Sequence, residues 1–241
     1  APVADDEAAE VGVRGELLAE AVPREVLARA RVRILRRHDA RRVLLDFEAM
    51  SHGRLPVIVG LGAALFGVRE DGAAWASACA DATAWPISTR GQETRDLDHD
   101  TVGWWLAQEE AVRAPVVRAL GHGSRAGLSD LRAAVLRVWQ AASAAGVREW
   151  WAKPAAYDLS LWWQLVREHV SPTARVHGKL RDARTLWNDV ELATGTPVRE
   201  PDLQPKHDPG VDALATACGC ADALAALIAI RTRATAAFDP T

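Results

Sequence analysis

The chain has only three cysteines among its 241 residues, Cys79, Cys218 and Cys220. Three are too few for a disulfide framework, and their spacing does not match a four-ligand zinc site. Cys218 and Cys220 lie two residues apart on an expected helix, so their side chains diverge by about 200° and we expect both to be inert. So little cysteine fits a reducing compartment, and we expect a cytoplasmic protein.

Charge of one sign and long apolar runs are also lacking. The 29 Lys and Arg residues face 32 Asp and Glu residues, which gives a formal net charge of −3. No global basic field attracts nucleic acid, so any nucleic-acid contact must be local. We find no apolar run of the ~18 residues that a membrane span needs, and the first 25 residues hold seven acids and no apolar leader core. The sequence therefore predicts a soluble protein that is neither exported nor membrane-bound, and it leaves a homodimer open.

What the chain does have is a globular composition, with 49% hydrophobic and 25% charged residues. Its length suits one large domain with an appendage. Residues 1–30 hold seven acids and three arginines, whereas residues 31–42 hold six arginines and one acid. Helical spacing of apolar residues before Arg42 favours two short helices, although a solvated charged extension fits equally well, and the arginine run fits a solvated face slightly better than a nucleic-acid contact. We predict a charged helical N-terminal extension over 1–41, a main domain over 42–234 and a C-terminal tail over 235–241.

Hydrophobic periodicity in the main domain predicts an α/β fold. Apolar residues alternate over 43–48, which predicts a strand, and the continuous apolar run at 57–66 predicts its hairpin partner. Further strands are expected at 73–78 and 147–151, and helices at 101–108, 159–169, 182–193 and 209–233, with another one capped by Ser129. A hairpin followed by alternating helices and strands indicates a mixed sheet flanked by helices.

Two glycine pairs do not complete a dinucleotide-binding fingerprint. Gly60-Leu-Gly62 lacks a Gly or Ala at the third position, and Gly121-His-Gly123 lies between two expected helices. We expect close backbone packing at the first pair and a loop at the second.

Asp46 and Glu48 are the first candidate site residues. They lie two apart on the expected strand, so their carboxylates share one face, about 7 Å apart along the backbone. Two buried acids side by side are costly because desolvation and like charge both oppose ionisation, and a divalent metal ion removes that cost. The pair would also suit a solvent-facing edge strand, which this pair alone slightly favours.

Three more candidates lie further along the chain. Asp158 precedes the expected helix at 159–169 and would also serve as its N-cap. His207 comes five residues before Asp212, across Asp208-Pro209, which has the pattern of a helix start. His207 and Asp212 can then face one cavity. An acid in a first helical turn also suits the helix dipole without any site, and a lone histidine is more often an ordinary loop residue.

Taken in order, these residues resemble the DEDDh 3′–5′ exonucleases, a branch of the ribonuclease H-like fold. The resemblance rests on Asp46-x-Glu48 in the first strand, Tyr157-Asp158 at a mid-chain helix, and His207 followed five residues later by Asp212. Within that superfamily the chain is most similar to the group that contains the phage T4 exonuclease A and the mycobacterial-type 3′–5′ exoribonucleases. The connecting segments that carry this similarity are 44–50, 98–108, 151–158 and 181–186.

The resemblance implies a ribonuclease H-like fold and a hydrolase that releases nucleoside 5′-monophosphates from the 3′ end of single-stranded RNA or DNA. Asp46, Glu48, Asp158 and Asp212 would hold two Mg²⁺ or Mn²⁺ ions about 4 Å apart. His207 would be the general base, since imidazole accepts a proton near neutral pH. Carboxylate oxygens suit Mg²⁺ or Mn²⁺ better than zinc.

Some residues depart from the family pattern. Ala49 stands where the family commonly has threonine after the Asp-x-Glu pair, so a hydroxyl near the terminal sugar is missing. Ala152-Lys153-Pro154 replaces a glycine-rich segment and adds a cation, which contacts a phosphate or is simply solvated. The candidate substrate contacts are Phe47, Ala49, Met50, Lys153 and Trp162.

The chain has ten tryptophans against one tyrosine and three phenylalanines. Trp104 and Trp105 fall in a segment that matches the family, and we expect them to form core and groove wall. Of Trp162 and Trp163 we expect one ring to pack inward, and a ring beside the site could stack on a terminal base. Core packing is the stronger expectation.

Two functions remain open on the sequence. The first is an active exonuclease, and the second is a catalytically weak module that binds nucleic acid or a protein partner through its N-terminal extension. Because all five catalytic residues are present, we expect an active enzyme.

Overall fold

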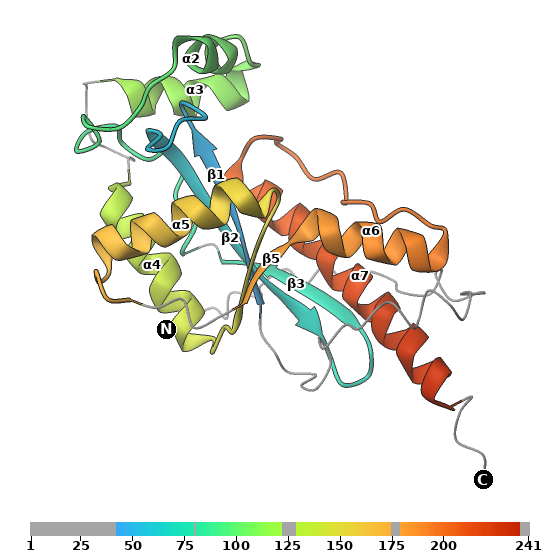
Figure 1. The fold of residues 1–241 in the computed structure, drawn as a ribbon. Coiled ribbons are helices and arrows are strands. Elements are labelled where there is room, and N and C mark those ends of the chain that lie inside the picture. The colour runs from blue at the N-terminus through green and yellow to red at the C-terminus, as the bar shows by residue number, and fades with distance from the viewer. Residues whose placement is uncertain (1–41, 80, 122–128, 175–178, 237–241) are drawn as a thin grey trace, which may run out of the picture.

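The computed structural model describes residues 42–79, 81–121, 129–174 and 179–236. Its strands are β1 (Arg42–Ala49), β2 (Ile58–Val68), β3 (Ala74–Ala78), β4 (Glu149–Ala152) and β5 (Lys179–Asp182). They form one sheet in the order β3-β2-β1-β4-β5, in which β1, β2 and β3 are antiparallel neighbours and β4 and β5 run parallel to β1. The predicted mixed α/β fold is confirmed, and the strand order is consistent with a ribonuclease H-like fold (Figure 1).

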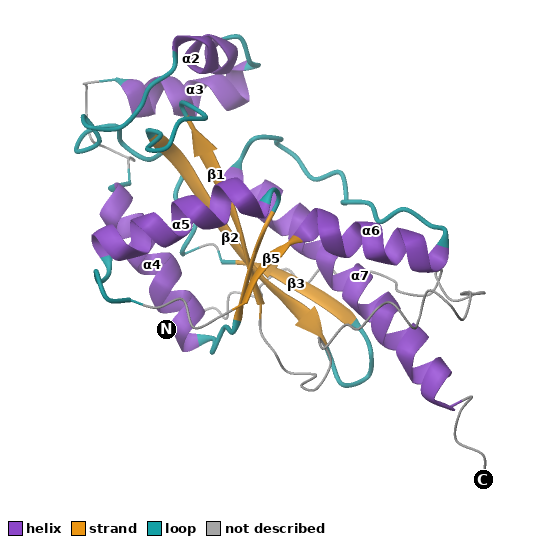
Figure 2. Cartoon of the chain, in the orientation of Figure 1, coloured by secondary structure: helices purple, strands orange, loops and turns teal. Residues whose placement is uncertain are grey.

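Helices cover both faces of this sheet. They are α2 (His99–Leu106), α3 (Glu110–Leu120), α4 (Leu131–Ala144), α5 (Ala155–His169), α6 (Ala183–Thr194) and α7 (Pro209–Ala236). One core cluster joins α4 and α5 to one face, and a second joins α6 and α7 to the other. A third cluster packs α2 and α3 against the segment around Met50, so these two helices form a lobe beyond the end of β1 (Figure 2).

Strand β1 lies in the middle of the sheet and is covered on both faces. Val43 and Leu45 pack into the core under α4 and α5, whereas Leu44 packs into the core under α7. Asp46 and Glu48 follow Leu44 at two-residue spacing and therefore face the α7 side. The edge-strand interpretation of these two acids is wrong, because β1 pairs with a strand on each side.

Local signals set several helix ends. Asp98 caps α2, Asp182 caps α6, and Gly195 ends α6 with a left-handed φ of 71°. The predicted cap Ser129 is wrong: the N-cap of α4 is Asp130, whose carboxylate accepts a hydrogen bond from the Ala133 N–H. Helix α5 begins at Ala155, before the predicted start.

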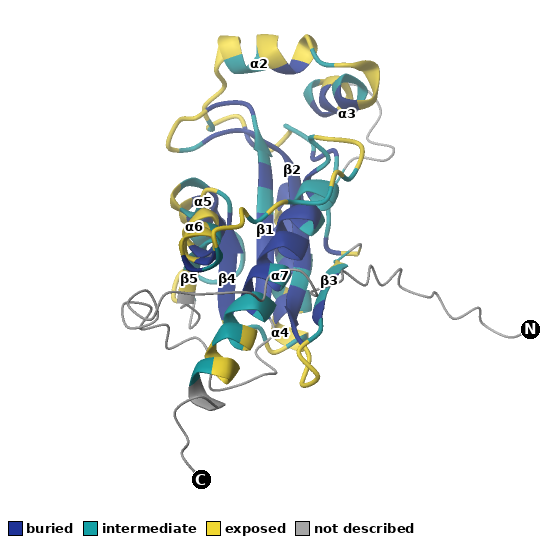
Figure 3. Ribbon diagram, turned by 90° about the vertical axis from the view of Figure 1, so that its right-hand side faces the viewer, coloured by how far each residue is buried: buried dark blue, intermediate teal, exposed yellow. Residues whose placement is uncertain are grey.

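The longest helix, α7, carries the composition of a membrane span and the burial of a core helix. Residues 209–234 are long and apolar enough to cross a membrane, contrary to the expectation from the sequence, yet 61% of the most apolar window is buried inside the protein. Cys218 and Cys220 are both buried in the core that α7 shares with the sheet. Burial decreases towards the C-terminal end of α7 (Figure 3).

Arg42, the last residue of the arginine run, is buried rather than solvated. Its Nε donates to Glu149 Oε2 at 2.8 Å, and Arg181 Nη2 lies 3.9 Å from the other oxygen of Glu149. The N-terminal extension (residues 1–41) and residues 122–128 of the second glycine loop lie outside the described residues, so the predicted domain boundaries stay predictions.

Candidate active site

Four acids from three elements, β1, α5 and α7, lie near one another. Burial raises the pKa of Asp46 well above its usual value, and the charges of Asp158 and Asp212 raise it further. Burial, followed by the charges of Asp46, Asp212 and Asp158, likewise raises the pKa of Glu48. Because the charges of Asp158 and Asp212 act on both Asp46 and Glu48, the four predicted acids from β1, α5 and α7 lie close together.

The two glycines of Gly60-Leu-Gly62 create the space for this arrangement. Gly62 pairs with Asp46 across the sheet and Gly60 pairs with Glu48. A Cβ atom on Gly62 would lie 1.7 Å from the Pro209 carbonyl oxygen, and one on Gly60 would lie 2.9 Å from Pro209 Cγ. The predicted close packing is thus confirmed, and the element that packs there is the start of the helix that carries Asp212.

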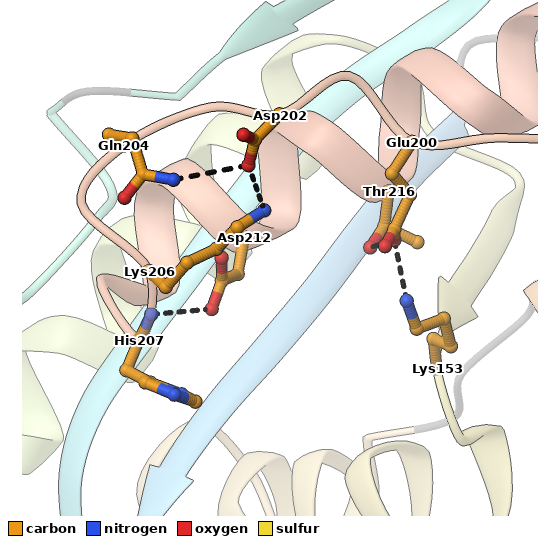
Figure 4. Close-up of polar contacts among 8 residues, drawn as sticks. All are labelled: Lys153, Glu200, Asp202, Gln204, Lys206, His207, Asp212 and Thr216. Atoms are coloured by element: carbon orange, nitrogen blue, oxygen red, sulfur yellow. Dashed lines mark hydrogen bonds and ion pairs between the residues drawn. The ribbon is translucent and has the colours of Figure 1, made fainter.

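The loop before α7 fixes His207 at the rim of the acids. Asp208 Oδ1 accepts from the Gly210 and Val211 N–H groups at 2.9 and 3.2 Å, and so starts the helix as predicted. His207 has a left-handed φ of 61°, and its N–H donates to Asp212 Oδ2 at 2.9 Å (Figure 4). Side-chain atoms of Glu48, His207 and Asp212 that could ligate a metal ion lie within 4.8 Å of one another.

Two tryptophans of α2 enclose the imidazole. The rings of Trp104 and Trp105 lie edge-on to the His207 ring, with centroids 5.1 and 5.9 Å away. Trp105 is buried, and its Nε1 donates to the Ala49 carbonyl at 3.0 Å. Trp104 is 46% exposed. The two tryptophans were expected to form core and groove wall. Trp105 is core, and Trp104 is the exposed wall beside His207.

Several candidate substrate contacts are corrected by their burial. Trp162 is 0% exposed and packs on Trp150 in the core, so its ring cannot stack on a base. The side chains of Phe47 and Met50 are also buried, which leaves only their main chains for a substrate. Ala49 is partly exposed.

Lys153 is partly buried, and its ammonium is already paired with a carboxylate rather than free for a phosphate. Its Nζ forms an ion pair with Glu200 Oε1 at 2.6 Å and lies 4.9 Å from the centroid of the Trp187 ring. Sequence reasoning did not find Glu200, which follows Lys153 by 47 residues in the chain.

Asp158 is buried in the first turn of α5 and is not its N-cap, which is Pro154. Burial raises the pKa of Asp158 to about 7, against a weaker lowering by Arg184. Burial also raises the pKa of Asp212, while the hydrogen bond from the His207 N–H opposes the rise. Carboxylates that repel one another and are poorly solvated fit a divalent cation, which offsets both costs. The oxygen-rich donor set suits Mg²⁺ or Mn²⁺.

Comparison with protein families gives one match over most of the chain. The sequence model of the 3′–5′ exoribonuclease Rv2179c-like domain matches residues 41–227. The chain belongs to this family. No curated protein matches the sequence significantly. Membership in the Rv2179c-like family confirms the predicted resemblance and supports a nuclease with 3′–5′ exoribonuclease activity, whose substrate is RNA.

Proposed function

We propose that the protein is a metal-dependent exoribonuclease that removes nucleoside 5′-monophosphates from the 3′ end of single-stranded RNA, with two Mg²⁺ or Mn²⁺ ions. The observation that carries this proposal is that ligand atoms of Glu48, His207 and Asp212 lie within 4.8 Å of one another, with Asp46 and Asp158 close enough for their charges to act on Glu48. Family membership independently supports the 3′–5′ exoribonuclease activity.

The four carboxylates would hold the ions, which supply Lewis acidity towards water, the scissile phosphate and the leaving 3′ oxygen. His207 accepts the proton of the attacking water at its imidazole. The backbone N–H of His207 donates a hydrogen bond to Asp212, and Trp105 packs edge-on against the imidazole. Together these contacts hold the imidazole beside the acids. His207 is thus positioned as a base before the substrate arrives.

Trp104 supplies a surface for the end of the substrate. It is exposed, it touches the catalytic histidine and it stands on the rim of the acid cluster. Stacking of a nucleobase on an aromatic ring contributes ~1 to 3 kcal/mol and tolerates any sequence. We infer that the terminal base stacks on Trp104, in the role that the sequence had suggested for Trp162.

The test offers labelled single-stranded RNA and DNA, each with a free or a blocked 3′ end, together with Mn²⁺, Mg²⁺ or EDTA. We expect stepwise release of mononucleotides from unblocked RNA with either metal, none in EDTA, and none from Asp46→Asn. Asp202→Asn is the matched control, since Asp202 is an exposed acid in the loop before α7. Cleavage in EDTA, full activity of Asp46→Asn, or binding of RNA without any cleavage would contradict the proposal.

A further inference from the structure

We propose that Lys153, Glu200 and Thr216 form a bridge that fixes the distance between the helices carrying Asp158 and Asp212, so that the acids are arranged for metal ions before these bind. The inference rests on the proposed function. It assigns a positioning role to three residues that do not belong to the acid cluster.

The bridge begins at the segment that leads into α5. Lys153 lies between β4 and α5, five residues before Asp158. Its Nζ contacts Glu200 Oε1 at 2.6 Å, and Glu200 belongs to the connection between α6 and α7. The contact therefore ties the start of one ligand-bearing helix to the approach to the other (Figure 4).

The bridge ends on α7 itself. The same oxygen, Glu200 Oε1, accepts a hydrogen bond from Thr216 Oγ1. Thr216 is buried and lies four residues after Asp212, on the same side of the helix. A movement of α7 that displaced Asp212 would also pull Thr216 away from Glu200.

Packing encloses the charged part of the bridge. Side chains of Lys153 and Glu200 are each 27% exposed, and the Lys153 ammonium lies over the Trp187 ring of α6. That ring packs directly on α7, because a Cβ on Gly219 would lie 3.2 Å from Trp187 Cζ2. A half-buried pair that loses one partner leaves an uncompensated charge, so the pair resists separation.

The bridge runs beside the acid cluster without joining it. Ala152 pairs with Leu45 in the sheet, which brings Lys153 close to Asp46. The Lys153 charge lowers the pKa of Asp46 and the Glu200 charge raises it. Because the two charges oppose each other at the site, we assign the bridge to geometry rather than to charge supply.

The start of α5 has a second attachment. The Ala155 N–H donates to Asp182 Oδ2 at 2.8 Å, which ties α5 to the cap of α6. Without the bridge, α5 therefore stays attached to α6, and it is mainly α7 that can shift. We expect bridge variants to keep the fold and to lose the arrangement of Asp212 relative to Asp158.

The experiment measures Mn²⁺ affinity by titration calorimetry on the full chain. The variants are Lys153→Met, Glu200→Gln and Thr216→Val, and melting temperatures without metal report their folding. Lys206→Met is the matched control, since Lys206 forms an exposed ion pair with Asp202 in the same connection. We expect Mn²⁺ affinity to fall about 10- to 100-fold in the bridge variants, as for other residues that support metal ligands, and to stay unchanged in Lys206→Met and nearly unchanged in Lys153→Arg.

Saturating Mn²⁺ should restore kcat in the bridge variants, because none of the three residues touches the reacting atoms. Thr216→Val keeps the ion pair and the side-chain volume, so it tests the bridge even if the charge variants do not fold. Wild-type affinity in Thr216→Val would overturn the bridge alone. Failure of the wild-type chain to bind Mn²⁺ would overturn the proposed function and the bridge together.

Discussion

A Cβ atom on Gly62 would lie 1.7 Å from the carbonyl oxygen of Pro209. The first turn of α7 thus rests directly on the bare backbone of β2. Because Gly62 pairs with Asp46, this contact also sets how closely Asp212 approaches the acids of β1. A missing side chain on one strand brings the proposed metal ligands of two other elements within reach of one another.

We expect Gly62→Ala to displace the start of α7 and to lower both stability and activity. Overpacking of this kind costs about 1 to 3 kcal/mol, and displacement of a ligand by about 1 Å lowers the rate by ~100-fold. Urea unfolding and the RNA cleavage rate measure the two effects. Gly103→Ala is the control, since a Cβ there meets nothing within 4 Å. A Gly62→Ala enzyme with wild-type activity would show that α7 can start elsewhere without harm.

Asp158 should make the stability of the metal-free protein depend on pH. Burial raises its pKa from 3.8 to about 7, so the folded state binds the proton more tightly than the unfolded state. The contribution of Asp158 to the free energy of unfolding is therefore highest below about pH 4 and falls as the pH rises towards about 7, by at most roughly 4 kcal/mol.

Denaturant unfolding in EDTA at several pH values, on wild type and Asp158→Asn, isolates this contribution. We expect the wild-type curve to fall more steeply with pH than the Asp158→Asn curve, and Mn²⁺ to reverse the loss near pH 8 only in wild type. Parallel curves for the two proteins would refute a raised pKa at Asp158.

Trp104→Ala should weaken substrate binding more than it slows catalysis. Loss of one stacked base is worth ~1 to 3 kcal/mol, which corresponds to a rise in KM of about 5- to 150-fold. Trp104→Phe should retain most of the affinity, and Leu106→Ala, another exposed apolar residue of α2, should leave KM unchanged. Steady-state kinetics on short single-stranded RNA separate KM from kcat. An unchanged KM in Trp104→Ala would exclude stacking at this ring.

His207→Asn should abolish most activity without harm to the fold. Asparagine adopts a left-handed backbone more readily than most residues, so it tolerates the φ of 61° and keeps the N–H that donates to Asp212. Loss of a general base lowers kcat by about 10²- to 10⁴-fold. Melting temperature and kcat on the same preparation test both parts, and a kcat within threefold of wild type, a bound of about 0.7 kcal/mol, would remove His207 from the mechanism.

The sequence was sufficient where a periodic pattern coincided with a local signal. Alternation over 43–48 predicted β1, and Asp208-Pro209 predicted the start of α7. The acids of these elements followed, because their spacing is fixed by strand and helix geometry. By contrast β5 has four residues, Lys-Leu-Arg-Asp, of which three are charged, and α3 contains Pro115. Neither element has a pattern that sequence reasoning can distinguish from a loop.

Contacts between distant segments were beyond the sequence. Trp104 and Trp105 are adjacent and identical in type, and it is contacts with distant segments, the Ala49 carbonyl and the core of the α2–α3 lobe, that bury Trp105. The same holds for Lys153, whose partner Glu200 is set by the crossing of α7 over the sheet. Trp162 failed as a substrate contact for this reason, since α5 turns that ring into the core.

The buried ion pair of Arg42 and Glu149 fixes the register between β1 and β4. It joins the first residues of β1 and β4, at the end away from the acids. A slip of two residues between these parallel strands would keep every side chain on its face but would break this buried ion pair, at a cost of about 3 to 5 kcal/mol. With Arg42 opposite Glu149, Leu45 falls opposite Ala152. The alignment of β1 and β4 at the end that carries the acids is therefore set at the opposite end, by residues that lie away from the acids.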